Sequence, residues 1–134
     1  MIVNEIMTPA EKVVIASPMT TVHDAIKSIK EHKVHAIIID KNGPQGAYGI
    51  LTYKNLLASV VAEEGDIDLL NVYDIATIPA LSISGMVDVK YAARLMIQNS
   101  IKRLLVTKDN ELQGIITMSD IMDHVIENID QIEG

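Results

Sequence analysis

The 134-residue chain contains no cysteine, no phenylalanine and no tryptophan. The absence of cysteine excludes disulfide bonds and thiol chemistry. Residues counted as hydrophobic still make up 49% of the chain, so the core has to be assembled from isoleucine, leucine, valine, alanine and methionine side chains. The length suits one compact unit and is too short for a catalytic domain joined to a separate regulatory domain.

Positive charge is also scarce, with 11 Lys and Arg against 18 Asp and Glu, for a formal net charge of −7. General binding to a nucleic-acid backbone relies on a basic surface, so we expect no nucleic-acid partner. The long apolar runs, such as 36–39, are far shorter than a membrane span, and the N-terminus lacks an export-signal pattern. We therefore expect no membrane partner and a cytoplasmic location.

Recognisable catalytic motifs are absent from the sequence. It has neither a Gly-x-Ser-x-Gly elbow nor a Gly-x-x-x-x-Gly-Lys phosphate loop, and no cysteine nucleophile. His32 and His35 lie close together, but no third ligand follows at the spacing of a metal site. We expect a protein that is not an enzyme and binds no metal, with nucleotide degradation as a remote alternative.

The chain repeats itself. Segment 3–8 is similar to segment 72–77, and a one-face helical pattern that begins at Val22 recurs from Val89. Thr21 and Asp88 precede these patterns and can cap the first backbone N–H groups of a helix. Both halves therefore contain the same amphipathic helix.

Two β-branched segments follow each of these helices. Segment 34–39 matches 101–106, and segment 48–56 matches 113–121 at a spacing two residues shorter, which leaves a turn insertion within 41–46. Further amphipathic helices are predicted over roughly 53–62 and 118–129. We predict an α+β fold with repeats 1–65 and 66–134. Each repeat has the order β-α-β-β-α, and the two pack sheet to sheet as one compact module.

Two motifs carry a family resemblance, and the second of them occurs in both halves. Ile6-Met7-Thr8-Pro9 lies near the start, and Gly-Ile-Leu-Thr (49–52) and Gly-Ile-Ile-Thr (114–117) each precede a helix. In this order and spacing the chain resembles a tandem pair of CBS domains over nearly its whole length. The resemblance implies pseudo-twofold symmetry and two clefts between the repeats. In family members these clefts commonly hold AMP, ADP, ATP or S-adenosylmethionine.

The first cleft is expected to hold its phosphates and ribose with the second repeat. Thr117 lies where a strand passes into a helix, and backbone N–H groups at such a start favour a phosphate. Asp120 follows in the first helical turn, where its carboxylate can accept hydrogen bonds from ribose hydroxyls. The resemblance assigns the same roles to Thr117 and Asp120 and includes Ser119, which lies between them, in the binding segment. It also places Arg103 at the family's basic position, beside Lys102.

By the same resemblance, the first repeat holds the adenine with Thr20, Ala25, Val34 and His35. The related second cleft has Thr52, with Asn55 in place of the acid and Ala36 in place of the arginine. Its base side would be Val87, Ala92, Ile101 and Lys102. Each lost charge-assisted hydrogen bond could cost roughly 1.5–3 kcal/mol, so we expect weaker or no binding there.

Plainer interpretations of these residues remain open. Thr117 with Asp120 is also an ordinary helix cap, a role that can coexist with ligand binding. Arg103 could be a solvated surface side chain.

The expected function is a regulatory module that senses an adenosine compound and passes the signal to an effector protein, with homodimer formation. The alternative is a ligand-free dimerisation or assembly module, for which the stripe Val125, Ile129 and Ile132 offers an interface.

Overall fold

The computed structural model describes the backbone of residues 1–133 and the side chains of residues 1–131. The chain forms two compact units. One is the continuous stretch Val14–Ala80, and the other joins Met1–Val13 to the residues from Leu81 onward. None of the helices in the described part of the chain combines the length and apolar character needed to cross a membrane.

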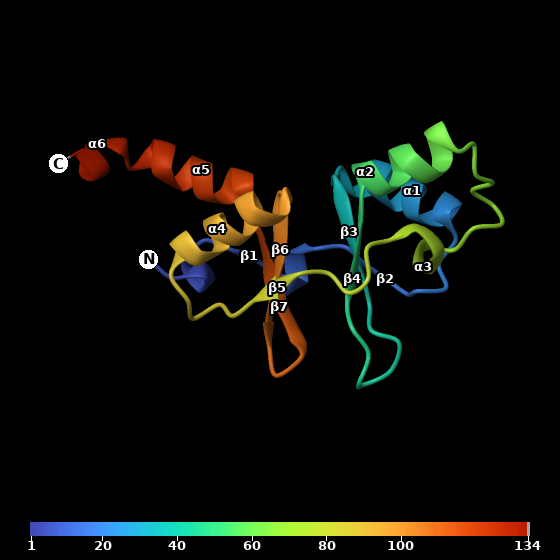
Figure 1. Ribbon diagram of the computed structural model, residues 1–134, viewed down its shortest axis with the longest axis horizontal. Helices are drawn as coiled ribbons and strands as arrows, with labels where there is room; N and C mark the ends of the chain where they lie inside the picture. The colour runs from blue at the N-terminus through green and yellow to red at the C-terminus, as the bar shows by residue number, and fades with distance from the viewer. Residues whose placement is uncertain (134) are drawn as a thin grey trace. The chain divides into compact units, whose positions relative to one another are not determined.

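The Val14–Ala80 unit holds a three-stranded sheet in the order β2-β3-β4, with β2 parallel and β4 antiparallel to β3. Helices α1 and α2 lie on one face of this sheet (Figure 1). Its elements, in chain order, are β2 (Ile15–Ala16), α1 (Val22–His32), β3 (Ala36–Ile39), β4 (Gly49–Thr52), α2 (Tyr53–Leu56), the π-helix η3 (Leu57–Ala62) and α3 (Val72–Ile75).

The other unit holds a four-stranded sheet in the order β1-β7-β6-β5, again with helices on one face (Figure 1). β5 runs parallel to β6, and β7 runs antiparallel to both β6 and β1. Its elements are η1 (Val3–Glu5), β1 (Thr8–Pro9), η2 (Ala10–Lys12), β5 (Ser82–Ile83), α4 (Val89–Asn99), β6 (Arg103–Lys108), β7 (Glu111–Thr117), α5 (Met118–Glu127) and α6 (Ile129–Glu133).

These elements confirm the predicted α+β class and the β-α-β-β-α order in both repeats. The predicted helix over 118–129 is too long, because α5 ends at Glu127 and Asn128 leaves the helical conformation before α6 begins. The other predicted outer helix, 53–62, is a four-residue α-helix continued by a π-helix. The hydrophobic periodicity of the sequence shows neither the break at Asn128 nor the π-helical continuation of α2.

The segment 3–8, which opens the first repeat, packs in the unit that holds the strands of the second repeat. The backbone N–H of Val3 donates to the carbonyl of Val87 at 2.9 Å. Thr8 lies opposite Ile115 in the β1–β7 ladder.

The related segment 72–77 does the same in the unit that holds the strands of the first repeat. The N–H of Val72 donates to the carbonyl of Thr20 at 2.8 Å, and Thr77 exchanges two backbone hydrogen bonds with Ile50. Each unit therefore takes its edge segment from the other repeat. The division at 1–65 and 66–134 stays a prediction about the repeats, and the compact units follow different bounds.

Each unit has its own aliphatic core, formed where helix and strand side chains meet. Alternation along the central strand turns Ile37 and Ile39 toward the helices of the Val14–Ala80 unit, where Leu51 joins them. Leu104, Val106 and Ile116 take the corresponding positions in the other unit, together with Val3, Ala92 and Met96. The two clusters are built from equivalent positions of the two repeats.

Gly114 gives a test of how β1 packs on β7. A Cβ added at this position would lie 2.3 Å from the backbone oxygen of Thr8, which belongs to the neighbouring strand. We expect Gly114→Ala to lower the free energy of unfolding by about 1–3 kcal/mol, because backbone has to shift. Gln113→Ala, at the exposed neighbouring position, is the control. Equal denaturant midpoints for the two variants would contradict the close approach.

Candidate functional site

The start of α5 is closed by two reciprocal hydrogen bonds. The N–H of Asp120 donates to Thr117 Oγ1 at 3.0 Å, and the N–H of Thr117 donates to Asp120 Oδ2 at 3.0 Å. These contacts form a capping box, so the plain interpretation of this pair as a helix cap is confirmed. Asp120 Oδ1 has no hydrogen-bond partner among the described residues. One carboxylate oxygen therefore supports the helix while the other is available to a ligand.

Two cationic residues lie beside this box. Arg103 opens β6 directly opposite Thr117 in the antiparallel ladder. The carbonyl of Lys102 accepts a 2.8 Å hydrogen bond from the N–H of Met118, which ties the start of β6 to the start of α5. The Arg103 side chain is half-buried, and neither cation pairs with a carboxylate in the part of the chain that the structure describes.

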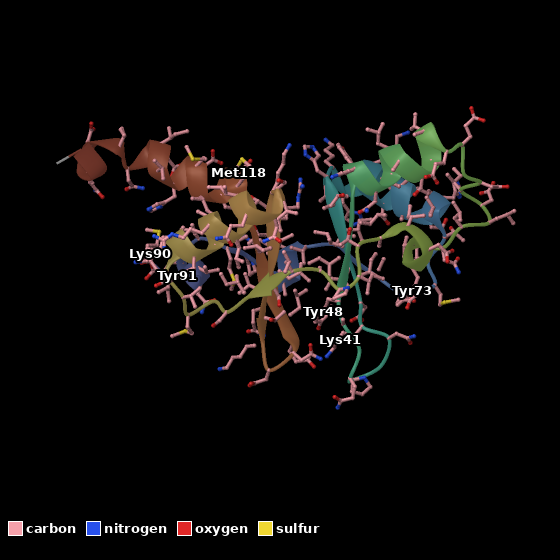
Figure 2. All side chains as sticks on the ribbon, in the orientation of Figure 1. Lys41, Tyr48, Tyr73, Lys90, Tyr91 and Met118 are labelled. Atoms are coloured by element: carbon pink, nitrogen blue, oxygen red, sulfur yellow. The ribbon has the colours of Figure 1, made fainter. Side chains whose placement is uncertain are left out.

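The structure thus gathers five of the predicted residues at one edge of one unit. They are Lys102, Arg103, Thr117, Ser119 and Asp120. Met118, whose side chain is exposed at the same edge, is labelled in Figure 2. Two unpaired cations near a helix start form a local positive region on a protein of net charge −7, suited to an anionic group.

The equivalent edge of the other unit carries neither the carboxylate nor the arginine, but Lys54 stands there at the position of Ser119. Thr52 and Asn55 form the same box: the N–H of Thr52 donates to Asn55 Oδ1 at 2.9 Å, and that of Asn55 donates to Thr52 Oγ1 at 3.4 Å. The residue opposite Thr52 is Ala36. Asn55 also donates from Nδ2 to Thr77 Oγ1 at 3.3 Å, so both ends of its amide are engaged.

Sequence reasoning missed that link between Asn55 and Thr77. The signal was present, because Thr77 belongs to the repeated segment 72–77, but its position beside the box depends on this segment of the second repeat packing in the Val14–Ala80 unit.

Two of the predicted base-binding residues are committed to the fold of the Val14–Ala80 unit. The N–H of Thr20 donates to the carbonyl of Ser17, and its own carbonyl accepts from the N–H of Val72. Ala25 is 1% exposed and packs in the core. A ligand at this surface would contact Thr20 through its half-buried side chain.

The other two base-side residues join α1 to β3. The N–H of Val34 donates to the carbonyl of Ile29 at 3.3 Å, and Val34 is half-buried. His35 is exposed, and its ring lies 5.0 Å from that of Tyr53, tilted by 36°. This ring pair, which sequence reasoning did not identify, places two flat rings at the start of α2.

The predicted base side of the second cleft lies in the other unit. Ala92 is fully buried in the core, and Ile101 packs against that core. Val87 is half-buried, with its carbonyl held by the N–H of Val3. Each predicted cleft takes residues from both units, so its closure around a ligand stays a prediction.

Among the described residues, no group of three or more histidine, aspartate or glutamate side chains is placed to hold a metal ion.

Comparisons with known proteins point to one family. A family model described as the CBS domain matches twice, at residues 3–62 and 72–127. The chain is 31% identical over 113 residues to uncharacterized protein MK0525 of Methanopyrus kandleri, covering 82% of this chain and 56% of that protein. It is 30% identical over 109 residues to the mitochondrial CBS domain-containing protein CBSX3 of Arabidopsis thaliana, covering 79% and 53%. The chain thus spans about half the length of these relatives.

Solved structures agree in fold. The hexameric CBS-CP12 protein from bloom-forming cyanobacteria is 33% identical, with a TM-score of 0.85 over 99% of this chain and 80% of that one. CBSX2, solved in complex with AMP, is 25% identical, with a TM-score of 0.79 over 94% of this chain and 96% of that one.

The two capping boxes predict how substitutions affect stability. Thr117→Val removes the acceptor for the N–H of Asp120 and should cost about 0.5–2 kcal/mol of unfolding free energy. Asp120→Asn should cost less, because Asn55 already completes the same box in the other unit. Urea denaturation followed by circular dichroism measures both. A larger loss for Asp120→Asn than for Thr117→Val would show that the box is not the main contribution.

Proposed function

Since this chain belongs to the CBS domain family, we propose that it is a regulatory module that binds an adenosine compound in a cleft between its two repeats. The candidates are AMP, ADP, ATP and S-adenosylmethionine. CBS domain pairs generally act as regulatory modules and not as catalysts. The observation that carries the proposal is the edge where Lys102 and Arg103, both unpaired among the described residues, lie beside the Thr117–Asp120 box.

The roles of these residues follow from their chemistry. Asp120 Oδ1 accepts hydrogen bonds from ribose hydroxyls while Oδ2 continues to cap α5. Arg103 presents a fork of N–H donors to a phosphate, and Lys102 adds a second positive charge. In the Val14–Ala80 unit, Thr20, Val34 and His35 form the adenine side. CBSX2 in complex with AMP supports a mononucleotide as the first ligand to test.

The second cleft binds weakly or not at all in this proposal. Its box holds Asn55 in place of a carboxylate, and that amide is already engaged by Thr52 and Thr77. Ala36 offers no cation where Arg103 stands in the first cleft. The proposal therefore includes one strong site for each chain.

Sensing requires that the ligand bind two states of the module with different affinity. A ligand held by Asp120 from one unit and by Thr20 and His35 from the other stabilises the arrangement that satisfies both sets of contacts. The change in population is then passed to an effector protein. The ligand itself leaves unchanged.

Isothermal titration calorimetry with AMP, ADP, ATP and S-adenosylmethionine tests the site with matched variants. Asp120→Asn keeps the box but removes the free anionic oxygen, so it should weaken binding about tenfold or more, as expected for the loss of about 1.5–3 kcal/mol. Asn55→Asp should strengthen the second cleft. Asp123→Asn, an equal loss of charge at an exposed position of α5, is the control and should bind as the natural chain does.

Two results would contradict the proposal. One is the absence of heat with all four compounds, and the other is equal binding by Asp120→Asn and the natural chain.

A second candidate function, assembly, is favoured by exposed apolar side chains on the outer helices. Met118, Met122 and Ile126 form one exposed stripe on α5. Tyr53, Leu57 and Val61 are exposed at the equivalent positions of α2 and η3. We propose that these stripes, defined by their six residues, form a homodimer contact. The hexameric CBS-CP12 relative supports assembly in general.

The stripe predicted from sequence, Val125, Ile129 and Ile132, shares no residue with the stripes defined above. Val125 is half-buried and Ile129 is exposed, whereas the side chain of Ile132 lies outside the described residues.

Light scattering coupled to gel filtration tests the dimer. The double change Met122→Glu with Ile126→Glu places two charges in the stripe, so we expect the dimer to dissociate. Lys108→Glu changes the net charge by the same amount at an exposed position of the β6–β7 hairpin and should leave the dimer intact. A dimer that survives the double change would exclude this stripe as the contact.

A further inference from the structure

Two large apolar side chains protrude further into solvent than the others among the described residues. Leu69 is 80% exposed and Ile97 is 79% exposed. They belong to different compact units, and neither lies on the outer-helix stripes. Charged residues of opposite sign accompany them, negative near Leu69 and positive near Ile97. Single exposed apolar residues need no explanation by themselves, so it is the opposite charge around the two that makes them candidates for a shared contact.

Ile97 lies on a basic face of α4. Lys90, Arg94 and Ile97 follow the i, i+4, i+7 spacing of one helix face, and Tyr91 lies beside them. Lys90 Nζ is 5.3 Å from the centre of the Tyr91 ring, and Arg94 Cζ is 5.7 Å from it. Lys90 and Tyr91 are labelled in Figure 2. We call these four residues the basic α4 face.

The charges of the basic α4 face are available for an outside partner. Neither Lys90 nor Arg94 forms an ion pair within the described part of the chain. The nearby acid, Asp88, caps α4 by accepting from the N–H of Lys90 at 2.9 Å, and this hydrogen bond lowers the pKa of Asp88. Asp88 therefore stays at the helix start as an anion, and Arg94 lies about one turn beyond Lys90 along α4.

Leu69 lies at the end of an ordered acidic turn. The carbonyl of Asp66 accepts from the N–H groups of Leu69 and Leu70 at 3.1 and 3.0 Å. Asp66 Oδ1 accepts from the N–H of Asp68 at 2.9 Å. The only side-chain partner of the Asp68 carboxylate among the described residues is His23, at 3.8 Å. We call Asp66, Asp68 and Leu69 the acidic turn.

The apolar and aromatic residues of the basic α4 face are not a requirement of the fold. In α1, the helix at the equivalent place in the other repeat, Lys27 stands where α4 has Arg94, and Lys30 stands where it has Ile97. His23 and Asp24 replace Lys90 and Tyr91. Since α1 folds to the same eleven-residue length without the apolar and aromatic residues, packing within the chain does not explain their presence in α4.

We propose that the basic α4 face of one copy binds the acidic turn of a second copy of this chain. Leu69 packs on Ile97 and Tyr91, while Asp66 and Asp68 face Lys90 and Arg94. Both surfaces are held by backbone hydrogen bonds, so little ordering is needed on contact. An apolar centre surrounded by complementary charges is the common arrangement of a specific interface.

The second copy is the occupant because the chain itself carries both complementary surfaces. The two surfaces differ, so the contact is heterologous: each copy uses one surface for one neighbour and the other surface for the next. Such contacts continue until a ring closes or an open chain forms. This assembly is independent of the proposed ligand site and of the homodimer stripes.

Charge reversal and mixing test the contact. Arg94→Glu places a negative charge on the basic α4 face, where it repels the acidic turn. Asp68→Lys places a positive charge on the acidic turn, where it repels the basic α4 face. Sedimentation velocity should show self-association about tenfold weaker for each variant alone. An equimolar mixture should associate again, because each variant supplies the charge that the other one needs. Added salt should weaken the natural assembly, since the screening length falls from about 10 Å at 0.1 M to about 3 Å at 1 M.

Lys108→Glu is the matched control, with the same change of charge at an exposed position of the β6–β7 hairpin, and should associate as the natural chain does. The homodimer stripes contain none of these residues, so dimerisation through them should persist in every variant. The proposal is overturned if Arg94→Glu associates as strongly as Lys108→Glu does, or if the mixture associates no better than its separate components.

Discussion

The backbone N–H groups at the start of a helix need acceptors, and this requirement organises the candidate site. In both repeats the strand that ends with threonine passes directly into a helix, and the third residue of that helix returns a side-chain oxygen to the threonine N–H. The geometry is the same whether that residue is Asn55 or Asp120. Because the cap fixes the place of the side chain, the two repeats differ there in charge and not in structure.

The charge difference extends to the opposite strand. Arg103 faces the threonine of one box, and Ala36 faces that of the other. The duplication therefore supplies one scaffold twice, and substitutions at a few exposed or half-buried positions give each copy its own chemistry. The outer helices, in contrast, keep the same chemistry in both repeats, since each carries an exposed apolar stripe.

Much of this arrangement could be predicted from the sequence. The helix starting at Val22 and its counterpart at Val89 follow from periodicity and from the capping residues before them, and the Gly-Ile-Leu-Thr and Gly-Ile-Ile-Thr motifs locate both boxes. The sequence could not show whether Ala25 and Ala92 are buried in the core or line a ligand cleft, because a small side chain suits both places. The positions of segments 3–8 and 72–77 depend on contacts distant in sequence, which no local pattern encodes.

The position of those two segments has a consequence for how such a protein can be built. Each compact unit is completed by a segment that belongs to the other repeat, through strand β1 in one unit and through the isolated bridge between Thr77 and Ile50 in the other. A polypeptide carrying one repeat could complete the same unit only by taking that segment from another molecule, and this step would depend on protein concentration. Joining two copies in one chain makes the exchange intramolecular and keeps each donor segment at a high effective concentration beside its acceptor.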